Sequence, residues 1–101
     1  MYDSSSHDAT ARRIARRLNA EYTEGKGADI VTEGAAIEVE PPETIRDAMR
    51  QLRGYRKGVY IAGTNREALK KALEVTAGTT VGVMNNSGDI VKGSTRKRKG
   101  K

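Results

Sequence analysis

The chain has 101 residues, 36% hydrophobic and 4% aromatic, which is enough for one small domain and too few for two. It contains no cysteine, which excludes disulfides and thiolate metal sites, and its first residues lack the long apolar run of a signal peptide or membrane span. We therefore expect a cytoplasmic protein without membrane contact, and a domain this small is also expected to form a homodimer.

The net charge of +6 comes from one end of the chain. Residues 96–101 carry five positive charges and no negative ones, which leaves 14 basic against 13 acidic residues, or +1, in the rest. We expect residues 95–101 to be a disordered basic tail that binds a polyphosphate such as DNA. A solubility tail or an expression remnant is the alternative. The candidate contacts in the tail are Arg96, Lys97, Arg98 and Lys99.

The first predicted element is a helix at residues 8–21, after a flexible start at residues 1–7. Its apolar residues have helical spacing: Ala11, Ile14, Ala15 and Leu18. Off this stripe lies a basic exposed face that we expect to bind nucleic acid, formed by Arg12, Arg13, Arg16 and Arg17. Lys26 and Arg53 are further candidates for the same role.

A hairpin is predicted next. A weak strand at residues 21–24 precedes two clear short strands at 28–32 and 35–40. The two residues between them, Glu33-Gly34, form a tight loop, because glycine permits the positive φ that such turns require.

The rest of the chain alternates helices and strands. Pro41-Pro42 ends the hairpin, because proline cannot donate to a strand ladder. Asn65 is a candidate helix cap and Gly78 a helix end. The predicted elements are a helix at 43–56, a strand at 58–62, a helix after Asn65, a strand at 79–84, a turn at 85–88 and a strand at 89–92. The order predicts a mixed α/β domain over residues 8–94, with a central mixed sheet flanked by helices.

The hairpin loop determines which residues face each other. With Glu33-Gly34 as the loop, Asp29 faces Glu38, and facing residues have Cβ atoms about 4.5–5.5 Å apart. Alternation places Glu40 on the same face. The other face is apolar and belongs in the core: Ile30, Ile37 and Val39.

This acidic face predicts a metal site. Facing carboxylates repel each other, and a divalent cation removes the repulsion by taking both as oxygen ligands. Without cysteine, and with His7 as the single histidine, Mg²⁺ or Mn²⁺ is favoured over zinc. Such a metal, with Glu40 holding a second ion or a water, suits phosphodiester hydrolysis. The alternative is that these are ordinary acids on a solvent-exposed sheet face.

The same residues carry a family resemblance. Gly27-Ala-Asp29-Ile-Val31, followed nine residues later by Ile37-Glu38-Val-Glu40, resembles the core motif of the PD-(D/E)XK nuclease superfamily over residues 8–84. Gln51-Leu-Arg-Gly-Tyr55 is similar to the Q-x-x-x-Y signature of its RecB-like and Cas4-like branch. The resemblance implies a restriction-endonuclease-like core and a Mg²⁺- or Mn²⁺-dependent deoxyribonuclease, with archaeal Holliday-junction resolvases as small dimeric counterparts in architecture.

The resemblance also implies residue roles. Asp29 and Glu38 would be metal ligands, with the Val39 carbonyl as a third. Gln51 and Tyr55 would lie over the hairpin and reach the site or the DNA backbone; alternatively, Gln51 is a surface residue and Tyr55 borders the core. An extra ligand would come from Asp8, or more weakly from His7; a helix N-terminal acid favoured by the dipole is the other interpretation of Asp8.

The chain departs from the motif at two positions. Ala28 stands where the motif has proline, and Glu40 stands in the slot usually held by lysine, as in some restriction enzymes of the superfamily. The missing positive charge would have to come from a second metal, Lys57 or Lys26. Two other functions stay open: a catalytically inactive nucleic-acid-binding module with this fold, and an accessory protein that binds a partner through its basic helix and tail.

Overall fold

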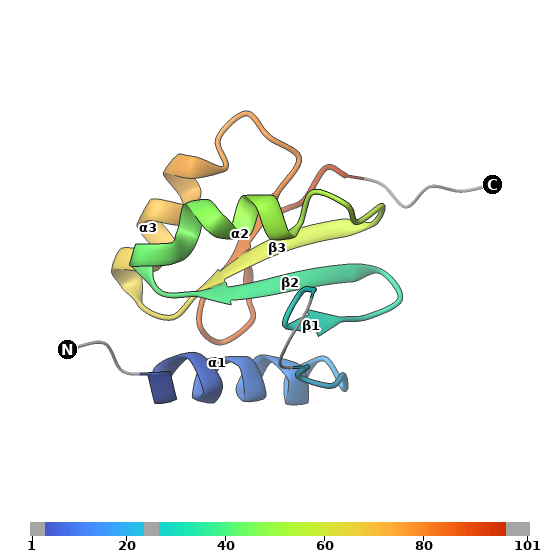
Figure 1. Cartoon of the computed structure of the whole chain (residues 1–101), viewed down its shortest axis with the longest axis vertical. Helices are drawn as coiled ribbons and strands as arrows, with labels where there is room; N and C mark the ends of the chain where they lie inside the picture. Colours follow the sequence, from blue (N-terminus) through green and yellow to red (C-terminus); the bar gives the residue numbers. More distant parts are fainter. Residues whose placement is uncertain (1–3, 24–26, 97–101) are drawn as a thin grey trace.

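A computed structural model describes residues 4–23 and 27–96, and in this part of the chain one five-stranded sheet carries three α-helices (Figure 1). The elements are α1 (Ser4–Arg17), β1 (Ile30–Val31), β2 (Ala35–Glu40), the 3₁₀ helix η1 (Pro42–Thr44), α2 (Ile45–Gln51), β3 (Gly58–Gly63), α3 (Arg66–Val75), β4 (Gly82–Met84) and β5 (Ile90–Lys92). The predicted mixed α/β fold is confirmed. In the described residues, no helix is both long and apolar enough to cross a membrane.

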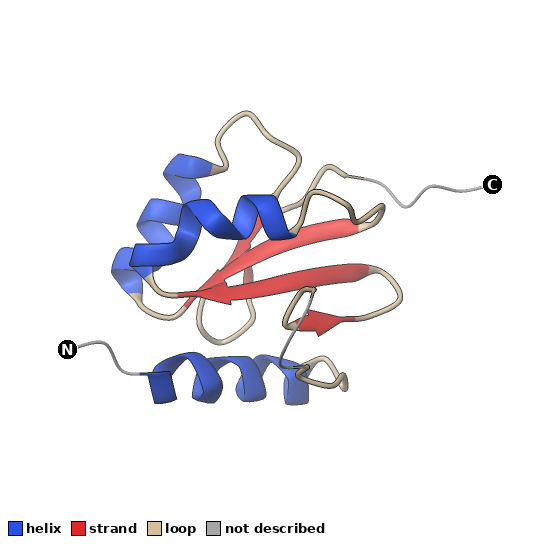
Figure 2. Cartoon of the chain, viewed as in Figure 1, coloured by secondary structure: helices blue, strands red, loops and turns tan. Residues whose placement is uncertain are grey.

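The strands lie in the sheet in chain order. β2, β3 and β4 are parallel, whereas β1 and β5 pair antiparallel at the two edges. The parallel strands are joined through α2 and α3, which cover the same face of the sheet (Figure 2). The carboxyl ends of β2, β3 and β4 therefore lie side by side along one border of the sheet, which we call its carboxyl edge to distinguish it from the edge strands β1 and β5. Open α/β sheets bind ligands at this border.

The hairpin has the predicted register. Ile30 pairs with Ile37 and Val31 with Ala36, so Glu33-Gly34 is the loop, and β2 has the predicted bounds. β1 is shorter than predicted, with two residues in place of five. The weak strand at 21–24 is reduced, in its described residues, to a single bridge between Tyr22 and Ile30.

Both faces of the sheet are buried. α1 covers the face that carries the apolar hairpin residues, in a cluster of Ala11, Ile14, Ala15, Ile30, Ile37, Val39, Ala62 and Met84. α2 and α3 cover the other face, whose cluster includes Ala36, Ile45, Ala48, Leu52, Val59, Ile61, Ala68, Ala72 and Val83. The side chains of Glu38 and Glu40 alternate with those of the first cluster, so they share the second face with Ala36 and lie under α2.

The helix ends differ from the predictions. α1 begins at Ser4, so residues 4–7, expected in the flexible start, belong to the helix, and it ends at Arg17. α2 spans only Ile45–Gln51 of the predicted 43–56. The Asn65 cap is confirmed, since its side chain accepts a hydrogen bond from the Ala68 amide at 2.8 Å.

The basic tail is packed at its start. The Thr95 amide donates to the Thr80 carbonyl at 3.0 Å, and the Arg96 guanidinium donates to the carbonyls of Leu52 at 2.7 Å and Tyr55 at 3.0 Å. Arg96 therefore binds the carbonyls that follow α2 and is not the free tail residue that was predicted. Lys97, Arg98 and Lys99 lie outside the described residues.

Candidate functional site

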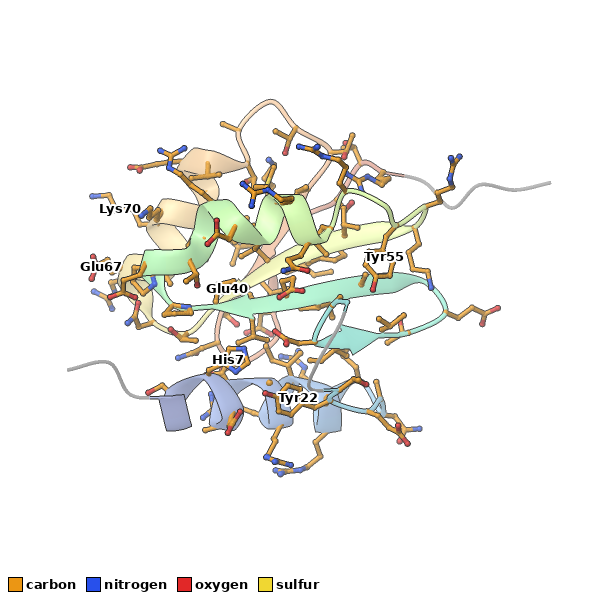
Figure 3. The ribbon with its side chains drawn as sticks, in the orientation of Figure 1. His7, Tyr22, Glu40, Tyr55, Glu67 and Lys70 are labelled. Carbon is orange, nitrogen blue, oxygen red and sulfur yellow. The ribbon has the colours of Figure 1, made fainter. Side chains whose placement is uncertain are left out.

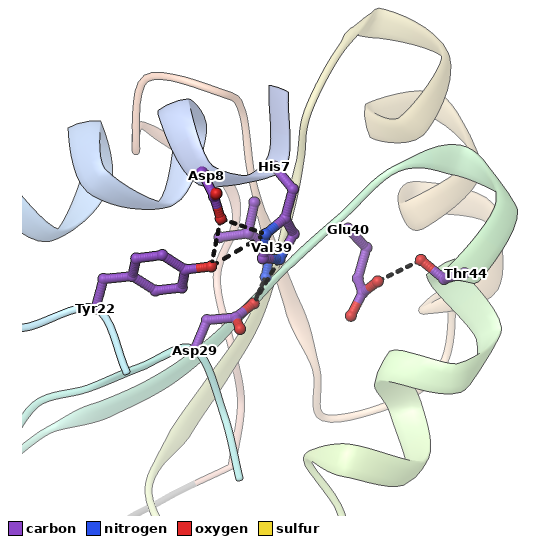
Figure 4. A network of polar contacts seen from close by, with 7 residues as sticks. All are labelled: His7, Asp8, Tyr22, Asp29, Val39, Glu40 and Thr44. Carbon is purple, nitrogen blue, oxygen red and sulfur yellow. Dashed lines mark hydrogen bonds and ion pairs between the residues drawn. The ribbon is translucent and has the colours of Figure 1, made fainter. Parts of the chain in front are cut away.

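The predicted acidic residues of the hairpin lie close enough to act on one another's pKa values, and Figure 4 shows two of them, Asp29 and Glu40. Asp29 Oδ2 accepts a hydrogen bond from the Val39 amide at 2.8 Å and lies 3.2 Å from His7 Nε2. β1 begins only at Ile30, so it offers no backbone carbonyl to the Val39 amide. The Asp29 carboxylate accepts the hydrogen bond from this amide instead. The Asp29 side chain is 15% exposed, and its contact with His7 links the hairpin to α1.

Glu38 is the most buried member of this cluster, with 5% of its surface exposed. Burial, the neighbouring charge of Asp29 and a hydrogen bond with Glu40 raise its pKa to about 9, so Glu38 holds a proton at neutral pH. Burial also raises the pKa of Glu40, opposed by a hydrogen bond from the Thr44 hydroxyl. The interpretation of Glu38 as an ordinary solvent-exposed acid is therefore wrong.

Helix α1 adds His7 to the cluster, and not Asp8. The Tyr22 hydroxyl donates to Asp8 Oδ1 at 2.7 Å and lies 3.3 Å from His7 Nδ1, which links the three side chains (Figure 4). The Tyr22 hydrogen bond lowers the pKa of Asp8. Adjacent helical residues point about 100° apart, so when His7 faces Asp29, Asp8 turns toward Tyr22.

The Tyr55 side chain binds the backbone of the hairpin. Its hydroxyl accepts a hydrogen bond from the Ala28 amide at 2.9 Å, one residue before Asp29. Gly27 has φ +86°, and a Cβ there would lie 2.9 Å from the Tyr55 hydroxyl. Tyr55 therefore positions Asp29, while Gln51 of the same motif is exposed on α2. In Figure 3, Tyr55 lies well apart from Glu40 and His7.

The missing lysine charge does not come from Lys57. Its Nζ donates to the Thr32 carbonyl at 2.8 Å, and it precedes Gly58, which pairs with Ala35 at the opposite end of β2 from Glu40. Lys26 lies outside the described residues. His7 does act on Glu40, because its charge opposes the rise in the pKa of that carboxyl.

Two arginines of the predicted basic face bind the protein itself. Arg13 donates to the Asn86 carbonyl at 2.8 Å, and Arg17 donates to the Ser87 carbonyl at 2.7 Å. Arg17 also forms an ion pair with Asp89 at 2.7 Å, and its hydrogen bond lowers the pKa of Asp89. Both arginines therefore tie α1 to the turn between β4 and β5.

The other two arginines face an open cavity on α1. Arg12 and Arg16 line it together with Asn19 and Tyr22, and its volume is about 490 Å³. The Arg12 guanidinium carbon lies 5.5 Å from the centroid of the Tyr22 ring, within the range of a cation–π contact. Arg53, the remaining candidate contact in the described residues, is exposed beyond α2.

The donor set fits a hard cation in its chemistry, since Mg²⁺ and Mn²⁺ prefer carboxylate and carbonyl oxygens. Asp29 and Glu38 offer carboxylates, and the Val39 peptide lies beside Asp29. Over residues 4–23 and 27–96, however, no three His, Asp or Glu side chains stand in an arrangement that would hold a metal ion.

The sequence did not predict the parts played by Tyr22 and Thr44. Tyr22 lies in the connection after α1, and Thr44 lies in η1 just after Pro41-Pro42. The turn that Pro41-Pro42 imposes was the available signal for a residue folded back onto Glu40.

No protein-family model, no curated protein and no solved structure matches this chain. Membership of the nuclease superfamily that the sequence motifs resemble therefore stays a proposal.

Proposed function

We propose that this chain is a metal-dependent nuclease domain with a restriction-endonuclease-like core, which hydrolyses phosphodiester bonds of DNA. One observation carries the proposal: Glu38 is buried against Asp29 and Glu40, and its pKa is raised to about 9. Burying a carboxyl among carboxylates lowers the stability of the folded protein. A divalent cation would remove the repulsion between these groups, so binding of the cation would be favourable.

Each residue of the cluster has a part in the proposed reaction. Asp29 and Glu38 would hold a Mg²⁺ or Mn²⁺ ion with the Val39 carbonyl. When bound, the metal supplies an activated water and neutralises charge on the phosphate. Tyr55 and the Val39 amide hold Asp29 in place. Glu40, fixed by Thr44, would orient the attacking water, and His7, 3.2 Å from Asp29, would help to hold that carboxylate in place.

The direct test is DNA cleavage. We expect the protein to cut duplex, branched or single-stranded DNA in Mg²⁺ or Mn²⁺. Asp29→Asn, which keeps an acceptor for the Val39 amide, should reduce the rate at least about 100-fold, because it removes a metal ligand. Asp47→Asn, an exposed acid on α2, is the matched control. Equal rates for Asp29→Asn and the wild type would contradict the assigned site.

Metal binding can be tested without cleavage. Because Glu38 holds a proton at neutral pH, Mn²⁺ must displace it. We expect calorimetric titration to show the affinity for Mn²⁺ rising up to about tenfold per pH unit between pH 6 and 8. An affinity that does not change with pH would mean that Glu38 is not a ligand.

A catalytically inactive nucleic-acid-binding module is the second candidate. It is favoured by Glu40 in the lysine slot and by Lys57 lying at the other end of β2. DNA binding without cleavage in either metal would support it.

The homodimer stays a prediction. The large apolar side chains exposed in the described residues lie on the edge strands β1 and β5: Val31, Ile90 and Val91.

A further inference from the structure

A second cavity lies along the edge of the sheet where the acidic cluster is found. Its volume is about 310 Å³, and its lining is Asn65, Arg66, Leu69, Asn85 and Asn86. Asn65 and Arg66 follow the end of β3, and Asn85 and Asn86 follow the end of β4. Because β2, β3 and β4 are parallel, this cavity and Glu40 share the carboxyl edge of the sheet.

The chemistry of this cavity suits an anion. Arg66 is the one charged side chain in its lining, it is exposed, and it forms no ion pair with the described carboxylates. The nearest acid on the β4–β5 turn, Asp89, is paired with Arg17 and bound by the Asn85 amide at 3.2 Å. In the described residues, the positive charge of Arg66 is therefore not neutralised by an ion pair, and the acid that follows it on α3 is Glu67.

The walls of the cavity are held in place by α1. Arg13 donates to the Asn86 carbonyl at 2.8 Å, which adds a second cation beside the cavity. The Asn85 side-chain oxygen accepts from the amides of Ser87 and Asp89 at 2.9 and 3.0 Å. These bonds fix the turn, and the Asn86 side-chain amide donates to the Thr64 carbonyl at 3.4 Å, which ties the turn to the end of β3.

The distance along the edge suits the backbone of a nucleic acid. Neighbouring strands lie about 4.8 Å apart, so β2 and β4 are roughly 10 Å apart. One strand of B-DNA carries a phosphate per ~3.4 Å of helix axis. Because the backbone winds around that axis, neighbouring phosphates lie farther apart than this rise, so the distance corresponds to about one or two nucleotides. A lining with one arginine, three amides and no aromatic ring suits backbone positioning better than base recognition.

We propose that this cavity binds a phosphate of the substrate strand about one or two nucleotides from the bond at the acidic cluster, with Arg66 as the main contact. The proposal rests on the proposed function for its substrate, a DNA strand. It assigns the cavity to binding, not to catalysis.

The test measures binding of a labelled 20-bp DNA duplex in EDTA, so that neither metal nor cleavage enters the readout. The variants are Arg66→Gln and, as the matched control, Lys70→Gln, one turn further along α3 and lining a different cavity (Figure 3). Losing one phosphate contact should lower the slope of log K against log salt by about 0.9 and weaken binding roughly 5–10-fold at 0.1 M salt. Lys70→Gln should change neither quantity, and both variants should melt like the wild type because both side chains are exposed.

The outcomes separate this proposal from the nuclease proposal. An unchanged slope and affinity for Arg66→Gln would overturn the phosphate site, even in a protein that cleaves DNA. Equal losses in Arg66→Gln and Lys70→Gln would also overturn it, because they would indicate diffuse attraction. A selective loss in Arg66→Gln would support the site, even if the protein cleaves nothing in Mg²⁺ or Mn²⁺.

Discussion

Replacing Glu38 by glutamine should stabilise the domain at neutral pH. The folded protein keeps a proton on Glu38 up to a pKa of about 9, whereas the ordinary value is 4.5. Between these values the folded state binds one proton more than the unfolded state, so stability is greatest below pH 4.5 and is lost as the pH rises toward 9. Glutamine keeps the shape and a hydrogen-bond donor but cannot ionise.

The size of the effect follows from one proton. One pH unit corresponds to about 1.4 kcal/mol, so the wild type should lose up to about 2.7 kcal/mol between pH 5.5 and 7.5. For a domain of this size that is roughly 10–20 °C in melting temperature. The raised pKa of Glu40 acts in the same direction. Asp8 and Asp89, whose pKa values are lowered, are ionised in both states over this range and add no slope.

Thermal and urea unfolding at pH 5.5, 6.5 and 7.5 in EDTA measure this directly. Glu38→Gln should remove most of the slope, whereas Glu67→Gln, an exposed acid on α3, should keep it. Parallel pH profiles for the wild type and Glu38→Gln would refute the reasoning, because they would show that Glu38 is not the group that gains the proton.

Three further substitutions test how the site is held. Tyr55→Phe leaves the Ala28 amide without its partner and should cost about 1–3 kcal/mol in urea unfolding, whereas Gln51→Ala, on the exposed face of α2, should change stability by less than about 0.5 kcal/mol; equal effects would contradict the positioning role of Tyr55. Gly27→Ala should destabilise by roughly 1–3 kcal/mol, because φ is +86° and the new Cβ meets the Tyr55 hydroxyl; the loss should be smaller in a Tyr55→Phe background, and strict additivity would argue against this contact. Asn65→Ala removes the cap of α3 and should lower the unfolding free energy by about 1 kcal/mol, which a change within error would disprove.

The hairpin shows which features the sequence could predict. The short loop at Glu33-Gly34 was visible between two runs of strand residues, so the pairing of Ile30 with Ile37 was predicted and is confirmed. The reason given for the loop was wrong, because Gly34 does not adopt the positive φ that was expected of it. The start of β1 was not predictable in the same way. At that point, side-chain oxygens replace backbone carbonyls as hydrogen-bond acceptors. The Tyr55 hydroxyl accepts from the Ala28 amide, and the Asp29 carboxylate accepts from the Val39 amide of β2.

In the candidate site, too, local features were predictable from the sequence and the packing of distant elements was not. The sequence predicted that Asp29, Glu38 and Glu40 share one place, because alternation along a strand is local. It did not predict that α2 buries Glu38, nor that His7 faces Asp29 in place of Asp8. Which side of a helix faces the sheet depends on where the helix begins and how it packs, and α1 begins at Ser4.

The position of α1 in the chain has a consequence for folding order. His7 and Asp29 are 22 residues apart, but Arg13 and Asn86 are 73 residues apart, so docking of α1 closes a loop over most of the domain. Contacts between distant segments form slowly, since the loop-closing entropy is lost before they contribute. The sheet with α2 and α3 should therefore gain protection from hydrogen exchange before α1 does. A chain at that stage holds Asp29 without its contact to His7, so the polar network between the hairpin and α1 would be complete only after the last step of folding.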